Sequence, residues 1–200
     1  VDRTVLVVGG GLAGLQAASA AAGLGHPVVL VERAAELGGF QAGVGDVVPE
    51  VPPFDRLHAN PVRELARAVR EDGRIRVLTS ARLASVSGQP GQFAVEVEVA
   101  GAREQLRAGA IVQATGARPY DASRLGHLGF GASPDVVTSA DLDRMLAGGK
   151  LARPSDGERP ARVVFVQCAG SRDAAHLAYC SSECCATSLR QVMAVHQAWP

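Results

Sequence analysis

The sequence lacks several features that would assign it to a familiar class of protein. Its 200 residues carry 20 basic and 20 acidic side chains, so no net charge would recruit nucleic acid or an anionic membrane surface. No apolar run is long enough to span a bilayer, and Val1-Asp2-Arg3 leads into an apolar strand instead of a signal peptide. We therefore expect no nucleic-acid partner, no transmembrane segment and a cytoplasmic location.

Aromatic residues and cysteines are also scarce. Aromatic side chains make up 4% of the chain, whereas glycine occurs 23 times, which suits tight turns between strands and helices. All 4 cysteines lie between Cys168 and Cys185. This distribution argues against a disulfide framework and favours one local metal or redox site in a reducing compartment. With 47% hydrophobic residues, the chain can bury one full domain and part of a second, as a fragment of a longer protein would.

The first segments predict a parallel βαβ unit. An apolar, β-branched run over Thr4–Val8 indicates a strand, Leu12–Leu24 indicates a helix closed by Gly25, and Pro27–Val31 indicates a second strand. Together they have the length of about thirty residues that is typical of such a unit.

The remaining patterns complete an α/β fold. They predict a surface helix over Val62–Asp72, alternating strands over Ile75–Val86 and Phe93–Val99, a buried strand over Ala110–Ala114, a helix over Ala140–Leu146, a strand over Arg162–Val166 and a helix over Ser182–Ala198. We expect a three-layer Rossmann-like domain with a parallel sheet and a β-meander over residues 1–120. An interdomain crossing over 121–160 and the truncated start of a second nucleotide-binding-like α/β domain over 161–200 would follow.

A glycine-rich turn joins the first predicted strand and helix. In its G-x-G-x-x-G pattern, Gly9 allows the sharp turn, Gly11 lets a pyrophosphate approach the backbone, and Gly14 lets the helix pack on the sheet. The helix N-terminus supplies N–H donors and positive potential. Glu32, at the end of the next strand, would accept hydrogen bonds from ribose hydroxyls. The predicted binding turn comprises Gly9, Gly10, Gly11, Leu12, Ala13 and Gly14.

These residues resemble the FAD- and NAD(P)-linked flavoprotein superfamily, and two further segments favour FAD. Arg33 with Leu37-Gly38-Gly39 resembles the R-x-x-x-L-G-G stretch that wraps the FAD phosphates, and Ala114-Thr115-Gly116 resembles the A-T-G motif that follows the strand leaving the cofactor domain. The resemblance implies that residues 1–120 form an FAD-binding domain. Beside the glycine turn, it implies as FAD-binding residues Glu32, Arg33, Gly38, Gly39, Ala114, Thr115 and Gly116.

The cysteine spacing Cys168-x11-Cys180-x3-Cys184-Cys185 supplies four thiols, enough for complete tetrahedral sulfur ligation. The dipole at the start of the predicted helix lowers the pKa of thiols placed there, such as Cys180 and Cys184, and so favours the thiolate. Spacing alone leaves open an iron-sulfur cluster, structural zinc, a dithiol redox pair that uses two of the four, and buried or disulfide-forming cysteines.

A longer resemblance covers most of the chain. Five segments together resemble the A subunit of heterodisulfide reductase, which is related to subunits of quinone-interacting membrane-bound oxidoreductase complexes. The segments are Pro134–Thr138, Arg153–Gly157, Val163–Asp173, Tyr179-Cys180-Ser181 and Cys184-Cys185. The resemblance implies an FAD-dependent oxidoreductase subunit that passes electrons between flavin and a 4Fe-4S cluster, with no catalytic acid, base or nucleophile. It implies partnership with other redox subunits or with ferredoxin- or hydrogenase-type electron carriers. The implied cluster ligands are Cys168, Cys180, Cys184 and Cys185.

The sequence also departs from this family. Val99–Arg107 contains no cysteine where many members carry a ferredoxin-like insertion, and Phe40–Arg56 lacks the cysteine that many carry there. Gln167–Ser171 stands where a second nucleotide domain would have its glycine turn, so we infer that a cluster replaces the nicotinamide cofactor. Arg172, Asp173 and His176 flank the cysteines and are compatible with cluster tuning or with ordinary surface charge.

Two other functions remain as alternatives. One is a pyridine-nucleotide-disulfide oxidoreductase, although its usual C-x4-C or C-x-x-C pair is missing and a vicinal Cys184-Cys185 disulfide would be strained. The other is a non-catalytic scaffold with a structural metal site.

Overall fold

The computed structural model describes residues 1–49 and 51–199, and its internal contacts divide the chain into two compact units. Unit 1 comprises Val1–Ala42 and Pro61–Ala117; unit 2 comprises Gly43–Asn60 and the chain from Arg118 onward. The segment 121–160, expected to be a crossing, is therefore part of a compact unit. None of the helices in the described ranges is long and apolar enough to cross a membrane.

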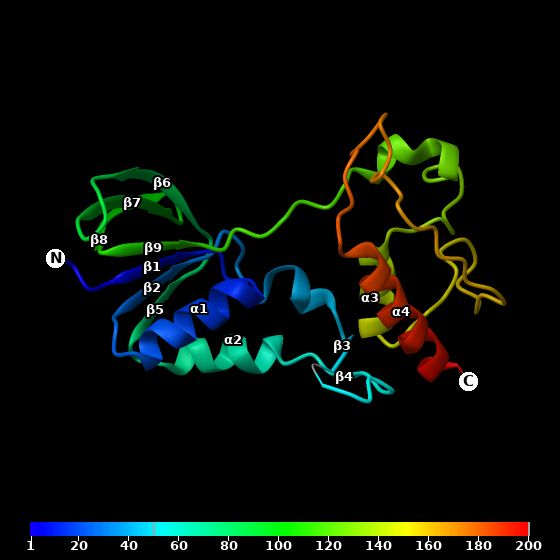
Figure 1. The fold of residues 1–200 in the computed structure, drawn as a ribbon, viewed down its shortest axis with the longest axis horizontal. Coiled ribbons are helices and arrows are strands. Elements are labelled where there is room, and N and C mark those ends of the chain that lie inside the picture. Colours follow the sequence, from blue (N-terminus) through cyan, green and yellow to red (C-terminus); the bar gives the residue numbers. More distant parts are fainter. Residues whose placement is uncertain (50, 200) are drawn as a thin grey trace. The chain divides into compact units, whose positions relative to one another are not determined.

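Unit 1 is built on a four-stranded sheet in the order β5-β2-β1-β9 (Figure 1). Its strands all pair in parallel, with Val5 opposite both Val28 and Ala110, and Val28 opposite Ile75. The predicted parallel βαβ unit is confirmed. The four strands are β1 (Val5–Val8), β2 (Val28–Val31), β5 (Ile75–Leu78) and β9 (Ala110–Gln113).

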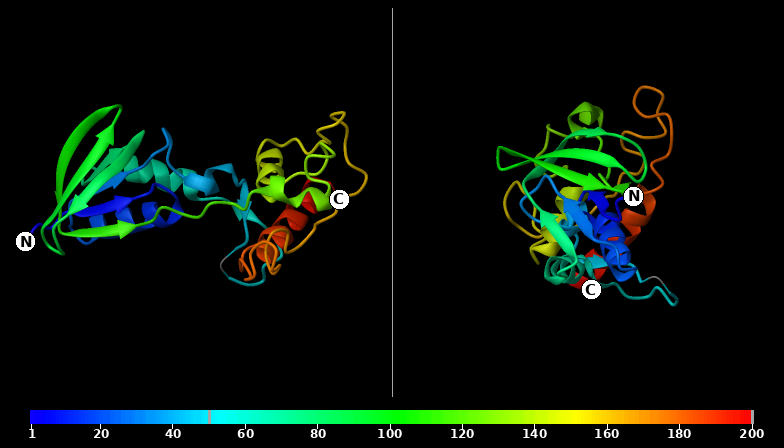
Figure 2. Two further views of the ribbon diagram at one scale, coloured as in Figure 1. Left: turned by 90° about the horizontal axis from the view of Figure 1, so that it is seen from above. Right: turned by 90° about the vertical axis from the view of Figure 1, so that its left-hand side faces the viewer.

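Helices cover one face of this sheet and an antiparallel meander covers the other, as Figures 1 and 2 show. The helices are α1 (Leu12–Gly23) and α2 (Val62–Glu71). The meander comprises β6 (Ala81–Ser87), β7 (Phe93–Val99) and β8 (Ala102–Ala108). The three predicted layers are therefore confirmed.

One predicted strand of unit 1 is two strands in the structure. The run Ile75–Val86 is interrupted before β6 by Ser80, whose φ of 50° lies in the left-handed region and whose N–H donates to the Ala34 carbonyl at 2.9 Å. This break lets β5 stay in the parallel sheet while β6 enters the meander. The alternation of apolar and polar residues stops at Val77-Leu78-Thr79-Ser80, so the sequence did contain a signal for this break.

Side-chain alternation along the strands produces a separate core on each face of the sheet. Since successive strand residues point to opposite faces, the two apolar sets of β1 and β2 pack against different layers. The core beneath the helices contains Val7, Leu15, Ala18, Val28, Leu30, Val62 and Val69. The core beneath the meander contains Leu6, Val31, Leu78, Val95, Val97 and Ala108.

Unit 2 contains two paired helices and little sheet. The helices are α3 (Ser139–Ala147) and α4 (Cys184–Ala198), which lie side by side in Figure 1. The short strands β3 (Asp46–Val47) and β4 (His58–Ala59) pair with each other. The 3-10 segments are η1 (Gly39–Gly43), which leads into the unit, and η2 (Ala122–Leu128).

A buried ion pair joins α3 to α4. Asp143 is 2% exposed and accepts from Arg190 Nη2 at 2.7 Å on each carboxylate oxygen, while Gln191 Nε2 donates to the same carboxylate at 2.9 Å. At the start of α3, Thr138 and Asp141 form a reciprocal capping box. The bonds from Arg190 and Gln191 to Asp143 connect the two helices, whereas the capping box stabilises the start of α3 alone.

The strand predicted over Arg162–Val166 is wrong. The segment has no strand structure, and Val164 and Val166 are 81% and 57% exposed. A strand requires a neighbour to satisfy its backbone groups. In the described part of unit 2, β3 and β4 are the strands present and they pair with each other. The helix predicted after it is confirmed, beginning at Cys184 instead of Ser182.

We predict that Leu15→Ala will lower the free energy of unfolding of unit 1 by about 2–5 kcal/mol, because it empties a fully buried position between α1 and the sheet. Leu24→Ala is the matched control, since Leu24 is the C-cap residue just after the same helix, is 78% exposed, and its loss should cost under about 0.5 kcal/mol. Urea unfolding followed by far-ultraviolet circular dichroism measures both. Equal losses in the two variants would contradict the observed core.

Candidate functional site

The glycine turn at the carboxyl end of β1 is closed by backbone contacts. Gly9 has a φ of 108° and donates its N–H to the Val31 carbonyl at 2.8 Å. A Cβ on Gly14 would stand 1.8 Å from the Gly9 oxygen, and a Cβ on Gly9 would stand 2.2 Å from the Ala114 oxygen. Both positions therefore exclude any side chain, in agreement with the turn and packing roles predicted for these glycines.

Gly11 is different because it faces open space. It stands at the N-cap of α1 with extended backbone, and the nearest atom to a Cβ built there is Gly39 Cα at 3.9 Å. No described side chain caps this helix terminus and no acidic residue lies in its first turn. The first N–H groups of α1, from Leu12, Ala13 and Gly14, are therefore available to an anion.

The segment Leu37-Gly38-Gly39 returns to this turn. Gly38 N–H donates to the Gly10 carbonyl at 2.8 Å, and a Cβ on Gly39 would stand 2.9 Å from Gly11 Cα. Leu37 is 7% exposed and anchors the segment in the core beneath the helices. The structure thus brings together residues that the sequence separates by some thirty positions.

Glu32 is buried beside the turn at 8% exposure. Its Oε2 accepts from Gly10 N–H at 2.6 Å, and its Oε1 accepts from Ala34 N–H at 2.7 Å. A carboxylate offers about four lone-pair sites, so two remain for further donors such as ribose hydroxyls. These bonds also hold the carboxylate at the turn.

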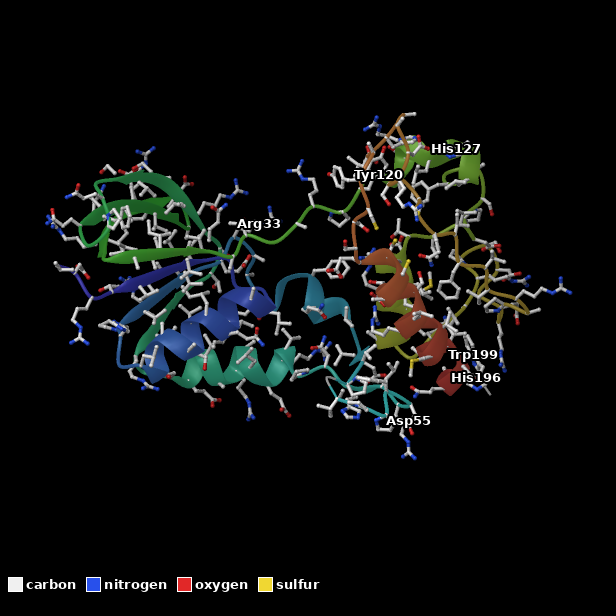
Figure 3. The ribbon with its side chains drawn as sticks, in the orientation of Figure 1. Arg33, Asp55, Tyr120, His127, His196 and Trp199 are labelled. Atoms are coloured by element: carbon white, nitrogen blue, oxygen red, sulfur yellow. The ribbon has the colours of Figure 1, made fainter. Side chains whose placement is uncertain are left out.

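The two other predicted segments lie at the same edge of the sheet. Arg33 follows Glu32 and is exposed at the carboxyl end of β2 (Figure 3). Ala114 continues β9 by donating its N–H to the Val8 carbonyl at 2.8 Å, and exposed Thr115 and Gly116 follow. An uncapped helix terminus, a buried carboxylate and close glycine backbones together fit a dinucleotide.

The cysteines lie in unit 2, on a loop and at the start of α4, and all four are free thiols. Cys168 is half-buried with a left-handed φ of 57°, while Cys180 is exposed and its sulfur accepts from the Ser182 N–H at 3.4 Å. Cys184 and Cys185 are the first two residues of α4.

The surroundings of Cys184 and Cys185 shift the pKa values of these two thiols in opposite directions. Hydrogen bonds from the Cys168 backbone N–H and the Ser181 hydroxyl lower the pKa of Cys184. The neighbouring thiolate of Cys184 raises the pKa of Cys185, and the charges of Cys168 and Cys180 add to that effect. Ser181 was missed in the sequence; its hydroxyl, three residues before Cys184, was the available signal.

The thiols are not gathered into a finished metal site. Within residues 1–49 and 51–199, no three His, Cys, Asp or Glu side chains are arranged to hold a metal ion. The donor set has the right chemistry and number for sulfur ligation, but the structure gives no cluster geometry. The assignment of Cys168, Cys180, Cys184 and Cys185 as ligands therefore stays a prediction.

Comparison with known protein families supports the flavin site. The family model described as pyridine nucleotide-disulphide oxidoreductase matches residues 3–152. This range includes all the segments that converge on the glycine turn, and it ends before the cysteines.

The curated relatives extend the similarity over the whole chain. The chain is 27% identical to the A subunit of the ferredoxin/F(420)H(2)-dependent CoB-CoM heterodisulfide reductase of Methanosarcina acetivorans, covering 100% of this chain and 35% of the relative. It is 26% identical to the iron-sulfur A subunit of the CoB–CoM heterodisulfide reductase of Methanocaldococcus jannaschii, covering 98% of this chain and 42% of the relative. The predicted resemblance to the A subunit of heterodisulfide reductase is confirmed, and the chain spans less than half the length of these relatives.

The alignment with the Methanosarcina relative runs over 282 residues, whereas this chain has 200. That relative therefore carries residues within the aligned region that have no counterpart here.

Similarity to solved structures is limited. The L-proline dehydrogenase from P. horikoshii overlaps with a TM-score of 0.47 at 23% identity, covering 58% of this chain and 23% of that chain. The thioredoxin reductase from T. acidophilum overlaps with a TM-score of 0.44 at 24% identity, covering 57% and 36%. These values are too low to bear on function.

We predict that, in the metal-free chain, alkylation of Cys184 will rise at lower pH than alkylation of Cys185. The thiolate is the reactive form, so the lowered pKa of Cys184 brings its reaction to lower pH and the raised pKa of Cys185 delays its own. Timed iodoacetamide labelling over a pH series, with fragment-ion mass spectrometry to separate the two, measures both profiles.

Ser181→Ala should move the pH profile of Cys184 alkylation to higher pH, because it removes the hydroxyl that donates to Cys184. Ser182→Ala leaves the Ser181 hydroxyl in place and serves as the control. Reaction of Cys185 at lower pH than Cys184 would contradict the observed hydrogen bonding.

Proposed function

We propose that this chain, which belongs to the pyridine nucleotide-disulphide oxidoreductase family, is an FAD-dependent electron-transfer segment of an oxidoreductase that resembles the A subunit of heterodisulfide reductase. It would exchange electrons between the flavin and a 4Fe-4S cluster. The observation that carries this proposal is the presence in one chain of four thiols and an open dinucleotide cradle, which consists of the glycine turn, the N-terminus of α1, Glu32 and the Gly38-Gly39 backbone. Similarity along the whole chain to a relative named as an iron-sulfur subunit supports the cluster.

FAD is the cofactor that the family and the cradle support. The first N–H groups of α1 and the open backbone at Gly11 would receive the pyrophosphate, and Glu32 would receive ribose hydroxyls. Gly38, Gly39 and the segment Ala114–Gly116 would line the rest of the site. When bound, FAD supplies the chemistry that takes up electrons in pairs and releases them singly.

The cluster is proposed to be held by Cys168, Cys180, Cys184 and Cys185. The Ser182 N–H donates to the Cys180 sulfur, and hydrogen bonding from the Cys168 backbone and the Ser181 hydroxyl lowers the pKa of Cys184. Such hydrogen bonds stabilise thiolates and raise the reduction potential of a cluster that the thiolates ligate. The protein's contribution is therefore to bind, orient and tune its cofactors, and we assign no catalytic acid, base or nucleophile.

The comparison with heterodisulfide reductases also suggests which kinds of protein this chain works with. The relatives are named as subunits of heterodisulfide reductases, and one of them as ferredoxin-dependent. We propose that this chain works with other redox subunits or with ferredoxin- or hydrogenase-type carriers. Its free thiols suit a reducing compartment such as the cytoplasm.

We predict that Gly11→Ala will weaken FAD binding at least tenfold without unfolding unit 1. The extended backbone of Gly11 tolerates alanine and the new methyl group meets no protein atom closer than 3.9 Å, but it fills the space assigned to the pyrophosphate. Isothermal titration of the chain with FAD measures the affinity.

Gly23→Ala is the control, because Gly23 ends the same helix with nothing within 4 Å of its added Cβ. It should bind FAD as the wild type does. A Gly11→Ala variant with wild-type affinity, or a wild-type chain that binds no FAD, would contradict the cofactor site.

We predict that Cys184→Ala will abolish assembly of the cluster and leave unit 1 folded. The test is anaerobic purification and reconstitution of the chain, followed by absorption spectroscopy, metal analysis and electron paramagnetic resonance after dithionite reduction. The wild type should contain flavin and about four irons with a reduced-cluster resonance. Ser182→Ala, a substitution beside the ligands, should keep that iron.

Full iron occupancy in Cys184→Ala would overturn the ligand assignment. Zinc in the wild type would assign the cysteines a structural role, and a metal-free flavoprotein would assign them dithiol chemistry; either would overturn the cluster.

A further inference from the structure

Tyr120 and His176 form a polar ring pair in unit 2, although the sequence separates them by 56 positions. The Tyr120 hydroxyl and His176 Nδ1 lie 2.6 Å apart, and the rings meet edge to face with centroids 5.7 Å apart. His127 stacks on His176 at 5.9 Å. Tyr120 and His127 are labelled in Figure 3, and Tyr120 and His176 are both half-buried.

The ring of Tyr120 also packs on the backbone of the cysteine loop. A Cβ on Gly170 would stand 2.5 Å from Tyr120 Cδ1, so the tyrosine ring occupies the space that any side chain at position 170 would need. Gly170 is buried and has a φ of 83°. Tyr120 therefore touches the loop twice, once through its ring at Gly170 and once through its hydroxyl at His176.

The loop that Tyr120 touches begins at Cys168 and ends at Cys180. Backbone hydrogen bonds close it, from Leu177 N–H to the Gly170 carbonyl at 3.2 Å and from Arg172 N–H to the Tyr179 carbonyl at 3.0 Å. These bonds pair residues 170–172 with residues 177–179 in the same chain direction. Cys168 lies two residues before the first bonded residue and Cys180 one residue after the last, so the closure restrains the backbone next to each cysteine.

The closed loop includes backbone that needs support from its neighbours. Cys168, Gly170 and Arg172 all have φ values in the left-handed region, at 57°, 83° and 54°. Residues other than glycine adopt this region only where surrounding contacts hold them there. The Tyr120 ring and its hydrogen bond to His176 supply such contacts from outside the loop.

We infer that Tyr120 and His176 are positioning residues of the cysteine site, which clamp the 168–180 loop and thereby restrain the backbone that carries Cys168 and Cys180. This inference rests on the proposed role of the four cysteines as ligands. Neither residue is assigned as a ligand; both act through the loop backbone. The pair links the segment before η2 to the loop, and His127 of η2 stacks a second ring on His176.

The test uses the whole chain with the variants Tyr120→Phe, His176→Leu and their combination. Tyr120→Phe keeps the ring on Gly170 and removes only the hydroxyl. Tyr179→Phe is the matched control, because Tyr179 is the other tyrosine of the chain, lies on the same loop and is 65% exposed. Any general effect of removing a phenol near the cysteines will appear in that control.

The first measurement is amide hydrogen exchange at Arg172 and Leu177 in the metal-free chain. Each single variant should accelerate exchange roughly fivefold, which corresponds to the loss of one neutral hydrogen bond. The double variant should do no more than His176→Leu alone, since the Tyr120 hydroxyl has no bond left to lose once His176 is replaced. Tyr179→Phe should leave exchange unchanged.

The second measurement is iron content, the resonance of the reduced cluster and its midpoint potential after anaerobic reconstitution. We expect Tyr120→Phe and His176→Leu to change the resonance and the potential relative to the wild type and Tyr179→Phe. Tyr120→Ala, which also removes the ring from Gly170, should lower iron occupancy. Flavin content should stay constant through the series, because unit 1 is untouched.

The outcomes separate this inference from the proposed function. A wild type without iron would overturn the proposed function, whatever the exchange rates show. The positioning role alone would be overturned if the wild type holds about four irons and both Tyr120→Phe and His176→Leu show the same amide exchange, cluster resonance and midpoint potential as the wild type.

Discussion

The fold of unit 1 depends on one close approach between backbones. Helix α1 packs so tightly on the turn after β1 that a Cβ on Gly14 would stand 1.8 Å from the Gly9 oxygen, and Gly9 itself lies under the Ala114 carbonyl. This approach fixes the start of α1 at the carboxyl edge of the sheet, where Glu32 and Gly38 also lie. The exposed N–H groups, the carboxylate and the open backbone at Gly11 form one site because the glycines permit that approach.

The sequence was sufficient for this part because its signals are local. Glycine spacing, apolar runs and alternation each report on a few consecutive residues, and they predicted the parallel sheet, the meander and the glycine turn. The resemblance to flavoproteins implied the other cofactor segments, Leu37-Gly38-Gly39 with Arg33 and Ala114–Gly116. The strand predicted at Arg162–Val166 failed because a strand depends on a partner that the pattern cannot see. The pair Tyr120–His176 had no signal either, since a contact across 56 positions leaves no periodic trace in one sequence.

The flavin site and the cysteine site differ in how completely the folded chain arranges their binding groups before any cofactor is bound. The flavin cradle is made of backbone and a carboxylate that is already hydrogen-bonded, so it forms with the fold. The cysteine site concentrates thiols whose charges oppose one another, as the raised pKa of Cys185 shows. Thiolates are brought together by the metal they bind, so ligation and final closure of such a site are coupled.

That coupling gives the loop contacts their importance. If the metal had to order a fully open loop, its binding would be weakened by the entropy of closing that loop. The bonds from Leu177 to Gly170 and from Arg172 to Tyr179 close part of it in advance, and the Tyr120 ring covers Gly170. In the chain, Tyr120 follows the proposed flavin segment Ala114–Gly116 after Ala117, Arg118 and Pro119 alone. One short connection therefore leads from residues proposed to bind the flavin to the residue that braces the cysteine loop.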